Sequence, residues 1–236
     1  KPSALPLALP TPAHQYSEPE DMTITPAAAS AAAREICELA PIVPVIVIND
    51  VAHARPLAEA LVRGGLPALE VTLRTPCAVE AIAEMAKVKG GVVGAGTLLT
   101  PADVKAVKAA GAKFGVSPGA TDKLLDACEA EGLPTLPGIA TSSEAMKMLE
   151  RGYTMLKFFP AEANGGAPAL KAIGSPLQDL SFCPTGGVSP SNAENYLSLS
   201  NVVCCGGSWV APTKLMEAGD WEGIEALARE ASQLPR

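Results

Sequence analysis

Residues 92–117 read VVGAGTLLTPADVKAVKAAGAKFGVS, and this stretch contains one complete unit of a pattern that recurs along the chain. Short apolar runs at Val92–Ala95 and Phe114–Ser117 predict two strands, and apolar residues at helical spacing over Ala102–Ala110 predict a helix between them. Two strands joined by a helix are typical of a parallel βαβ unit. The pattern therefore predicts an α/β protein with a parallel sheet.

The chain from Pro26 onward contains eight short apolar runs, which begin about every 20 to 25 residues and predict eight strands. These runs are Val45–Ile48, Leu69–Leu73, Val92–Ala95, Phe114–Ser117, Thr135–Leu136, Met155–Phe159, Leu180–Cys183 and Val202–Cys205. Segments with helical spacing lie between them, as at Ala52–Arg63.

Eight parallel strands, each followed by a helix, are typical of a (β/α)8 TIM barrel. An alanine-rich segment over Pro26–Leu39 predicts an extra N-terminal helix before the first strand. An open doubly wound sheet is the structural alternative. That fold would be expected to carry a GxGxxG motif after its first strand, but Asn49–Asp50 stands there.

The composition bounds the domain organisation. Hydrophobic residues make up 48% and charged residues 18% of the 236-residue chain, which is typical of a globular protein. We therefore expect a single TIM-barrel catalytic domain over residues 26–236. Residues 1–25 are rich in proline and lack apolar periodicity, so they predict a flexible tail, compatible with the remnant of a targeting segment or with an internal start at Met22.

Charge and scarce residue types exclude several classes of function. The formal net charge of −7 argues against nucleic acid or an anionic membrane as a partner, because both require a basic surface. Six cysteines without CxxC spacing predict buried free thiols and a cytoplasmic location, or an organelle if the tail is a leader remnant. The only histidines, His14 and His53, leave too few groups for a His-rich metal site or for Ser-His-Asp hydrolysis.

The second predicted strand, ALEVTLR at Ala68–Arg74, carries polar residues on one of its faces. Side chains alternate along a strand, so Glu70, Thr72 and Arg74 share a face opposite three apolar residues. In a barrel the apolar face packs against the helices, which leaves the polar face inside. A Glu70–Arg74 salt bridge is one explanation. A ligand site is the other, and it is favoured because Arg74 ends the strand, where barrel active sites lie.

The sixth predicted strand holds a lysine among apolar residues, in MLKFFPAE at residues 155–162. An edge strand would let Lys157 reach solvent, but a closed barrel has no edges. The same alternation places Lys157 inside the barrel with Glu70. Apolar neighbours penalise the ammonium form, so we expect an amine that is neutral often enough to attack a carbonyl.

Glycine pairs follow the last two predicted strands, at Gly186–Gly187 and Gly206–Gly207. The loops after strands seven and eight of TIM barrels frequently bind phosphate, and glycine lets backbone amides approach it closely. The pairs therefore favour an anion site, although turn glycines are the alternative. Thr97 ends the third predicted strand and is either a ligand contact or a helix N-cap.

Taken together, the motifs at the strand ends closely resemble those of the 2-keto-3-deoxy-6-phosphogluconate aldolase family, which also acts on 4-hydroxy-2-oxoglutarate. The resemblance runs from about Ala31 to Ala231. It rests on EVTLRT (70–75), VGAGT (93–97), SPG (117–119), LPGIATSSE (136–144), KFFPAEANGG (157–166), FCPTGGVSP (182–190) and GGSW (206–209).

The resemblance implies a class I aldolase that forms a homotrimer and uses neither a metal nor another cofactor. It implies Lys157 as the Schiff-base residue and Glu70 as the general acid/base. Its other implied positions are Arg74 and Thr97 for the substrate carboxylate, Pro118 and Phe159 for the pocket wall, and Gly186, Gly187, Gly207 and Ser208 for phosphate. The implied substrate is a small phosphorylated 2-keto acid.

Three other activities stay open at this point. A metal-dependent lyase or epimerase would use the same fold but needs a ligand cluster. A 2-keto-3-deoxy-6-phosphogalactonate aldolase would share both fold and mechanism. A non-catalytic phosphate-binding barrel would explain the glycines but not the pairing of Lys157 with Glu70.

Overall fold

The computed structural model describes residues 23–236, so residues 1–22, most of the expected tail, lie outside the described residues. The first element is the expected extra helix, α1 (Pro26–Cys37). Thr25 caps this helix, because its hydroxyl accepts a hydrogen bond from the N–H of Ala28 at 3.2 Å.

Parallel strands form the centre of the fold. Hydrogen bonds join them in the order β5-β4-β3-β2-β1-β9 and, in a second group, β6-β7-β8. The strands are β1 (Ile42–Ile46), β2 (Ala68–Thr72), β3 (Val92–Gly96), β4 (Phe114–Val116), β5 (Thr135–Leu136), β6 (Gly138–Ile139), β7 (Met155–Phe158), β8 (Ser181–Pro184) and β9 (Cys205–Gly207).

Two features join the two groups of strands into one ring. The strands β5 and β6 are consecutive parts of the fifth predicted strand, interrupted only at Pro137. Single bridges between Phe182 and Val202 and between Thr185 and Gly206 join β8 to β9. The predicted (β/α)8 TIM barrel is therefore confirmed.

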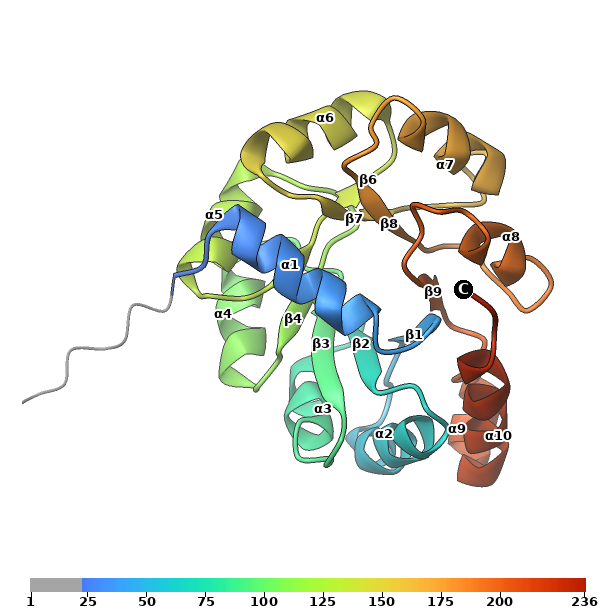
Figure 1. Cartoon of the computed structure of the whole chain (residues 1–236). Helices are drawn as coiled ribbons and strands as arrows, with labels where there is room; N and C mark the ends of the chain where they lie inside the picture. The colour runs from blue at the N-terminus through green and yellow to red at the C-terminus, as the bar shows by residue number, and fades with distance from the viewer. Residues whose placement is uncertain (1–22) are drawn as a thin grey trace, which may run out of the picture.

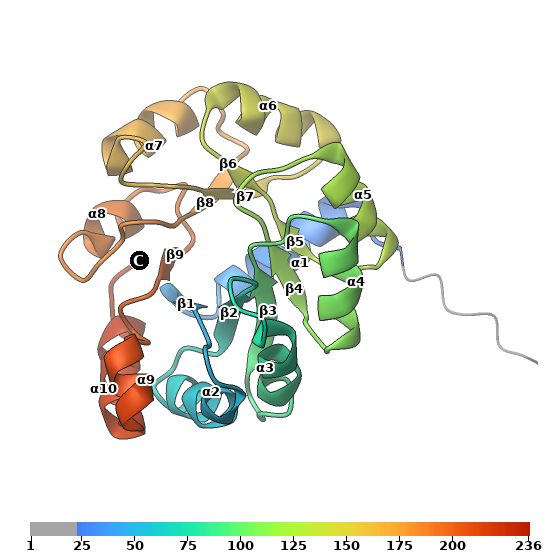
Figure 2. The same cartoon turned by 180° about the vertical axis from the view of Figure 1, so that it is seen from behind.

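Helices surround the strands, as Figure 1 and, from behind, Figure 2 show. They are α2 (Ala54–Arg63), α3 (Ala78–Met85), α4 (Pro101–Ala109), α5 (Asp122–Ala130), α6 (Ser142–Arg151), α7 (Gly166–Gly174), α8 (Ala193–Leu197), α9 (Thr213–Ala218) and α10 (Trp221–Ser232), with a 3-10 helix, η1 (Val51–His53), before α2. Over residues 23–236, none of the helices combines the length and the apolar character needed to cross a membrane.

Helix α1 lies across one end of the strands (Figure 1). The hydroxyl of Ser30 accepts hydrogen bonds from the N–H groups of Thr154 and Met155, at 2.9 and 2.8 Å, where β7 begins. Arg34 donates to the hydroxyl of Ser181, the first residue of β8, at 2.8 Å. The helix therefore covers the amino ends of the strands, and the carboxyl ends face the opposite side.

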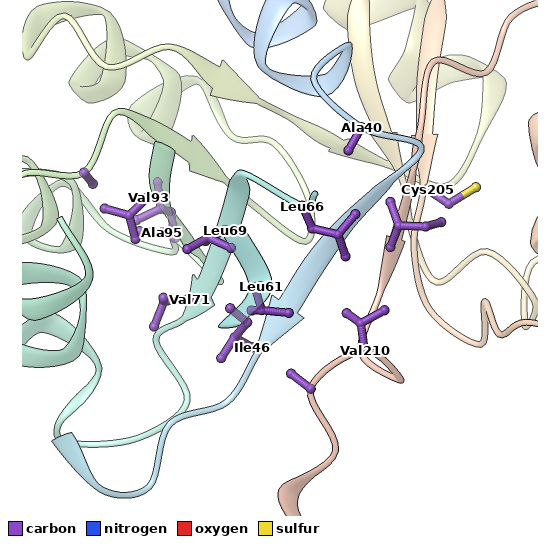
Figure 3. Packing of buried hydrophobic residues seen from close by; sticks show 14 of the residues in the cluster. Ala40, Ile46, Leu61, Leu66, Leu69, Val71, Val93, Ala95, Cys205 and Val210 are labelled. Atoms are coloured by element: carbon purple, nitrogen blue, oxygen red, sulfur yellow. The ribbon is translucent and has the colours of Figure 1, made fainter. Parts of the chain in front are cut away.

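The buried apolar residues form two layers, one on each face of the strands. The outer layer packs strands against helices, and Figure 3 shows part of it, with Ile46, Leu69 and Val71 of the strands and Leu61 of α2. The inner layer fills the barrel near α1 and consists of Cys37, Val43, Ala68, Phe114, Val116, Leu136, Met155, Cys183 and Cys204. The predicted alternation of faces is confirmed, since Met155 is inner and Leu156 outer.

The strand boundaries differ from the prediction at the two ends of the barrel sequence. Strand β1 begins at Ile42 rather than Val45, because its first residues pair with β9 and Pro44 lies within this pairing. Strand β9 begins at Cys205 rather than Val202, because Val202 makes only one isolated bridge to β8. Pairing with neighbouring strands, rather than the length of an apolar run, sets these boundaries.

Candidate active site

A cavity of about 410 Å³ lies at the carboxyl ends of the strands, opposite α1. Barrels of this fold carry their active sites at this end. The cavity is lined by Val45, Val47, Arg74, Thr97, Pro118, Lys157, Phe159, Thr185, Gly186, Gly187, Val188, Gly206 and Ser208. Eight of the ten predicted site residues belong to this wall; the exceptions are Glu70 and Gly207.

The floor of the cavity is a buried ion pair. The Nζ atom of Lys157, on β7, lies 3.1 Å from Oε1 of Glu70, on β2, across the barrel interior. Their side chains are only 6% and 4% exposed. Two buried charges at this distance satisfy each other, so the lysine expected inside the barrel with Glu70 has that carboxylate as its direct partner.

The structure also corrects the alternative pairing of Glu70 with Arg74. The carboxylate of Glu70 pairs with Lys157, and none of the ion pairs found within residues 23–236 involves Arg74. Arg74 lies two residues beyond β2, is exposed, and lines the cavity with its cation available. It is therefore placed to bind an anionic group of a ligand.

Gly96 of β3 makes room for the carboxylate of Glu70. A Cβ atom at Gly96 would lie 2.3 Å from Oε1 of Glu70, closer than any real contact allows. On the other side of the pair, the ring centroid of Phe159 lies 5.3 Å from Nζ of Lys157, within the range of a cation–π contact. The ion pair is thus held between a glycine and an aromatic ring.

Thr97 has a backbone φ of 62°, in the left-handed region that β-branched residues rarely adopt. The proposed role of Thr97 as a helix N-cap is wrong, because Thr100 caps α4 with a complete capping box. A strained residue on a cavity wall points to a functional position. Thr97 is therefore placed for ligand contact.

The loop after β8 carries the predicted glycines in conformations that favour glycine. Gly186 and Gly187 have φ values of 98° and 79°, and both line the cavity. After β9 the cavity wall contains Gly206 and Ser208, whereas a Cβ at Gly207 would lie 2.0 Å from the ring of Trp209. The glycine at 207 thus makes space for an aromatic ring, and its neighbour Gly206 faces the cavity.

Sequence reasoning missed four residues of the cavity wall, Val45, Val47, Thr185 and Val188, and it named Gly206 only as a member of a glycine pair. The most informative is Thr185, because Cys183 belongs to the inner layer and the residue two positions later shares its face. A Cβ at Gly206 would lie 2.3 Å from Oγ1 of Thr185, so the two strand ends approach closely here. Strand alternation was the signal that could have found Thr185.

Three buried thiols lie below the ion pair in the inner layer, on Cys37, Cys183 and Cys204. Hydrogen bonds from Cys204 and Cys37, together with the nearby charge of Lys157, hold the pKa of the Cys183 thiol below its usual range. Burial raises the pKa of the Cys205 thiol, which lies on the outer face of β9. All six cysteines are free, as predicted.

Comparison with known proteins identifies the family. A family model described as KDPG and KHG aldolase matches residues 33–227. The 2-dehydro-3-deoxy-phosphogluconate aldolase of Pseudoalteromonas atlantica is 52% identical over 199 residues, 84% of this chain and 93% of that protein. The KHG/KDPG aldolase of Escherichia coli K12 is 52% identical over 200 residues, 84% of this chain and 94% of that protein.

Solved structures agree with this match. The 2-keto-3-deoxy-6-phosphogluconate aldolase of Zymomonas mobilis with 3-phosphoglycerate superimposes with a TM-score of 0.82 at 48% identity, over 86% of this chain and 95% of that one. The KDPG aldolase of Legionella pneumophila, with pyruvate captured as a covalent carbinolamine intermediate, superimposes with a TM-score of 0.82 at 45% identity. The match covers 85% of this chain and 98% of that one. The chain belongs to the KDPG and KHG aldolase family.

Proposed function

We propose that this protein is a class I aldolase that cleaves 2-keto-3-deoxy-6-phosphogluconate to pyruvate and glyceraldehyde 3-phosphate, with Lys157 as the nucleophile. The observation that carries the proposal is the buried pair of Lys157 and Glu70, 3.1 Å apart, at the floor of the cavity. An amine beside a proton acceptor is the arrangement that Schiff-base catalysis requires. Relatives with this activity at 52% identity support it.

The first step is attack of Nζ of Lys157 on the C2 ketone of the substrate. In the ion pair Lys157 carries a proton, which must leave before the nitrogen can attack, and Glu70 is the acceptor within hydrogen-bond distance. Nitrogen adds to C2 to give a carbinolamine, whose hydroxyl takes the proton back from Glu70 and leaves as water, so that an iminium ion forms beside the Glu70 carboxylate. The positive iminium then replaces the ammonium as the partner of the inner carboxylate.

The second step breaks the C3–C4 bond. Glu70, directly or through a water molecule, takes the proton of the C4 hydroxyl, and the electrons of the C3–C4 bond move to the iminium, which becomes a neutral enamine. Glyceraldehyde 3-phosphate leaves. Glu70 returns its proton to C3 of the enamine, and hydrolysis of the regenerated iminium then releases pyruvate and restores Lys157 as the ammonium partner of Glu70.

The remaining wall residues hold the two ends of the substrate. The exposed guanidinium of Arg74, with Thr97, binds the carboxylate next to the ketone. Pro118 and Phe159 enclose the reacting carbons. At the other end, Gly186, Gly187, Gly207 and Ser208 bind the phosphate through backbone amides and a hydroxyl, without adding a positive side chain.

The finer properties of the protein follow from the same family membership. We propose that 4-hydroxy-2-oxoglutarate is cleaved as well, to pyruvate and glyoxylate, because the carboxylate and the ketone are the parts that both substrates share. We also propose a homotrimer, one domain over residues 26–236, and a cytoplasmic or organellar location. Light scattering of the purified chain tests the trimer, and a monomeric mass would contradict it.

The proposed function is tested by trapping the Schiff base. Borohydride reduction in the presence of pyruvate is expected to fix a pyruvate-derived group on Lys157, identified by peptide mass spectrometry. Lys147 on α6 is the matched control, because it is exposed and pairs with Asp122 on the surface. Lys157→Met is expected to abolish both the adduct and pyruvate release, whereas Lys147→Met retains both. An adduct elsewhere, or none, contradicts the proposal.

Two alternatives give different results in simple assays. A non-catalytic barrel would release no pyruvate from any 2-keto acid. A 2-keto-3-deoxy-6-phosphogalactonate aldolase would favour the other C4 epimer, so the ratio of kcat/KM for the two epimers separates it from the proposed activity.

A further inference from the structure

The loop after β8, residues 186–189, lies between two cavities. Gly186, Gly187 and Val188 line the catalytic cavity on one side. Glu162 and Asn192 line a second cavity, of about 710 Å³, between α7 and α8. The residues of the second cavity contact the loop from its outer side, away from the catalytic cavity.

The carbonyl oxygens of Gly186 and Gly187 each accept a hydrogen bond, which holds the peptide group between each glycine and the next residue. The backbone N–H of Glu162 donates to the carbonyl of Gly186 at 3.0 Å. The side-chain Nδ2 of Asn192 donates to the carbonyl of Gly187 at 3.0 Å, while its Oδ1 accepts from the N–H of Ser189 at 2.8 Å. These hydrogen bonds fix both peptide planes from the outer side.

Glu162 is itself held in place. Tyr196, fully buried, donates a hydrogen bond from its hydroxyl to Oε1 of Glu162. The stem of Glu162 packs on the loop so closely that a Cβ at Gly187 would lie 2.6 Å from its Cγ. A chain of contacts therefore runs from Tyr196 of α8 through Glu162 to the loop.

The orientation of these carbonyls determines where the next N–H groups point. In a planar trans peptide the C=O and the following N–H point in opposite directions. The carbonyls of Gly186 and Gly187 point toward the backbone of Glu162 and the side chain of Asn192, so the N–H groups of Gly187 and Val188 point away from these partners, and both residues line the catalytic cavity. Successive N–H groups with this orientation form a concave anion site.

We propose that Asn192 and Glu162 are positioning residues that aim the N–H groups of Gly187 and Val188 at the phosphate, and so set the preference for phosphorylated over unphosphorylated substrates. The inference rests on the proposed function. Two consecutive glycines with positive φ are free to change conformation unless their carbonyls are held. Loss of one of these hydrogen bonds therefore weakens phosphate binding but leaves the reaction of the ketone with Lys157 unchanged.

The test compares a phosphorylated with an unphosphorylated substrate. In Asn192→Ala, KM for 2-keto-3-deoxy-6-phosphogluconate is expected to rise about tenfold, the effect of one hydrogen bond. For 4-hydroxy-2-oxoglutarate, which lacks the phosphate, kcat and KM are expected to stay within about twofold. Asn195→Ala is the matched control, because Asn195 also lines the outer cavity and none of the side-chain hydrogen bonds found within residues 23–236 joins it to the loop.

Tyr196→Phe provides a second variant, which keeps the aromatic ring and removes only the hydroxyl that holds Glu162. A selective rise in KM of about threefold is expected there, and this variant decides the matter if Asn192→Ala does not fold. An equal rise in KM for both substrates, or no rise for either, overturns the proposal, since a merely structural role predicts one of these results.

A binding measurement separates this inference from the proposed function. If the unmodified chain cleaves neither substrate, the proposed function fails. Broadening of the ³¹P resonance of inorganic phosphate still reports on the loop. Weaker binding in Asn192→Ala than in Asn195→Ala supports the positioning role, and equal binding overturns it.

Discussion

Replacing Gly96 by alanine tests whether the position of one carboxylate controls the chemistry. The new methyl group would lie 2.3 Å from Oε1, 2.8 Å from Cγ and 2.9 Å from Cδ of Glu70. Gly96 does not have a positive φ, so alanine fits the backbone and the effect is purely steric. The side chain of Glu70 must therefore move, and its 3.1 Å contact with Lys157 is lost.

The magnitude follows from the burial of the pair. Separating a buried ion pair costs about 3–5 kcal/mol, and exchange of glycine for alanine in a strand returns about 0.5–1 kcal/mol. We therefore expect a loss of about 3 kcal/mol in the free energy of unfolding. Loss of a positioned general acid/base lowers kcat by about 10²–10⁴-fold.

Gly94→Ala is the matched control on the same strand. Gly94 is the pairing partner of Glu70 on β3, but the nearest atoms to a Cβ at Gly94 belong to the ring of Phe114, in the inner layer, at 2.4 Å, and not to the carboxylate. This overpacking costs about 1–3 kcal/mol of stability but is expected to lower kcat less than about threefold. Denaturant unfolding gives the stability of both variants, and a coupled assay of pyruvate release gives kcat.

The reasoning is refuted if Gly96→Ala keeps its kcat, or if both variants lose the same factor. The first result would mean that the exact place of Glu70 is unimportant for proton transfer. The second would mean that the loss reflects general damage to the barrel rather than the carboxylate. Adduct formation with pyruvate and borohydride locates the defect, since trapping without turnover indicates a fault in proton transfer.

Three further outcomes are expected. Thr97→Gly relieves the strain of its left-handed φ and is expected to stabilise the protein by about 0.5–1 kcal/mol in thermal unfolding, while raising KM for 2-keto acids; lower stability contradicts the strain. The N–H of Ala140 and the hydroxyl and N–H of Thr141 hold the pKa of Glu144 below its usual value, so its contribution is present at neutral pH and is lost as pH falls through the folded pKa. Glu144→Gln is therefore expected to cost about 0.5 kcal/mol at pH 7, small because the carboxylate is exposed, and nothing in acid; a pH-independent difference contradicts this. A thiol reagent is expected to label Cys77 first in the native protein, since the other five cysteines are buried; rapid labelling of more than one thiol contradicts that burial.

The alternation of side chains along strands made the central pair predictable. Because the period of a strand is two residues, the apolar pattern of β2 fixed the face of Glu70, and the pattern of β7 fixed the face of Lys157. Closure of the barrel then brought both faces into one interior. The direction of each side chain thus followed from the sequence, although the two residues are 87 positions apart.

The partner of Glu70, and its distance from that partner, could not be predicted from the alternation of side chains along a strand. The sequence allowed Glu70 to pair with either Arg74 or Lys157, since all three share the interior or its rim. The choice depends on the height of each residue along its strand and on the space left by Gly96, and both are set by the stagger of neighbouring strands. Apolar periodicity carries no information about stagger.

The fifth strand shows the same limit. Pro137 interrupts it between β5 and β6, and a proline inside a strand normally argues against that strand. Here the carbonyl of Pro137 still accepts a hydrogen bond from the N–H of Lys157 at 2.8 Å. A Cβ at the following Gly138 would lie 2.4 Å from the backbone of Pro118, so the break lets β6 approach the end of β4.

The backbone at this break contacts two residues of the catalytic cavity, Lys157 and Pro118. The hydrogen bond from the N–H of Lys157 to the carbonyl of Pro137 fixes the height of Lys157 on β7, and the close approach at Gly138 fixes Pro118 on the wall of the same cavity. Below them the inner layer consists of buried apolar side chains, and above it Lys157 and Glu70 are hydrogen-bonded to each other. A ketone that binds at Lys157 therefore also lies beside Glu70, so binding already brings the groups of the proposed reaction together.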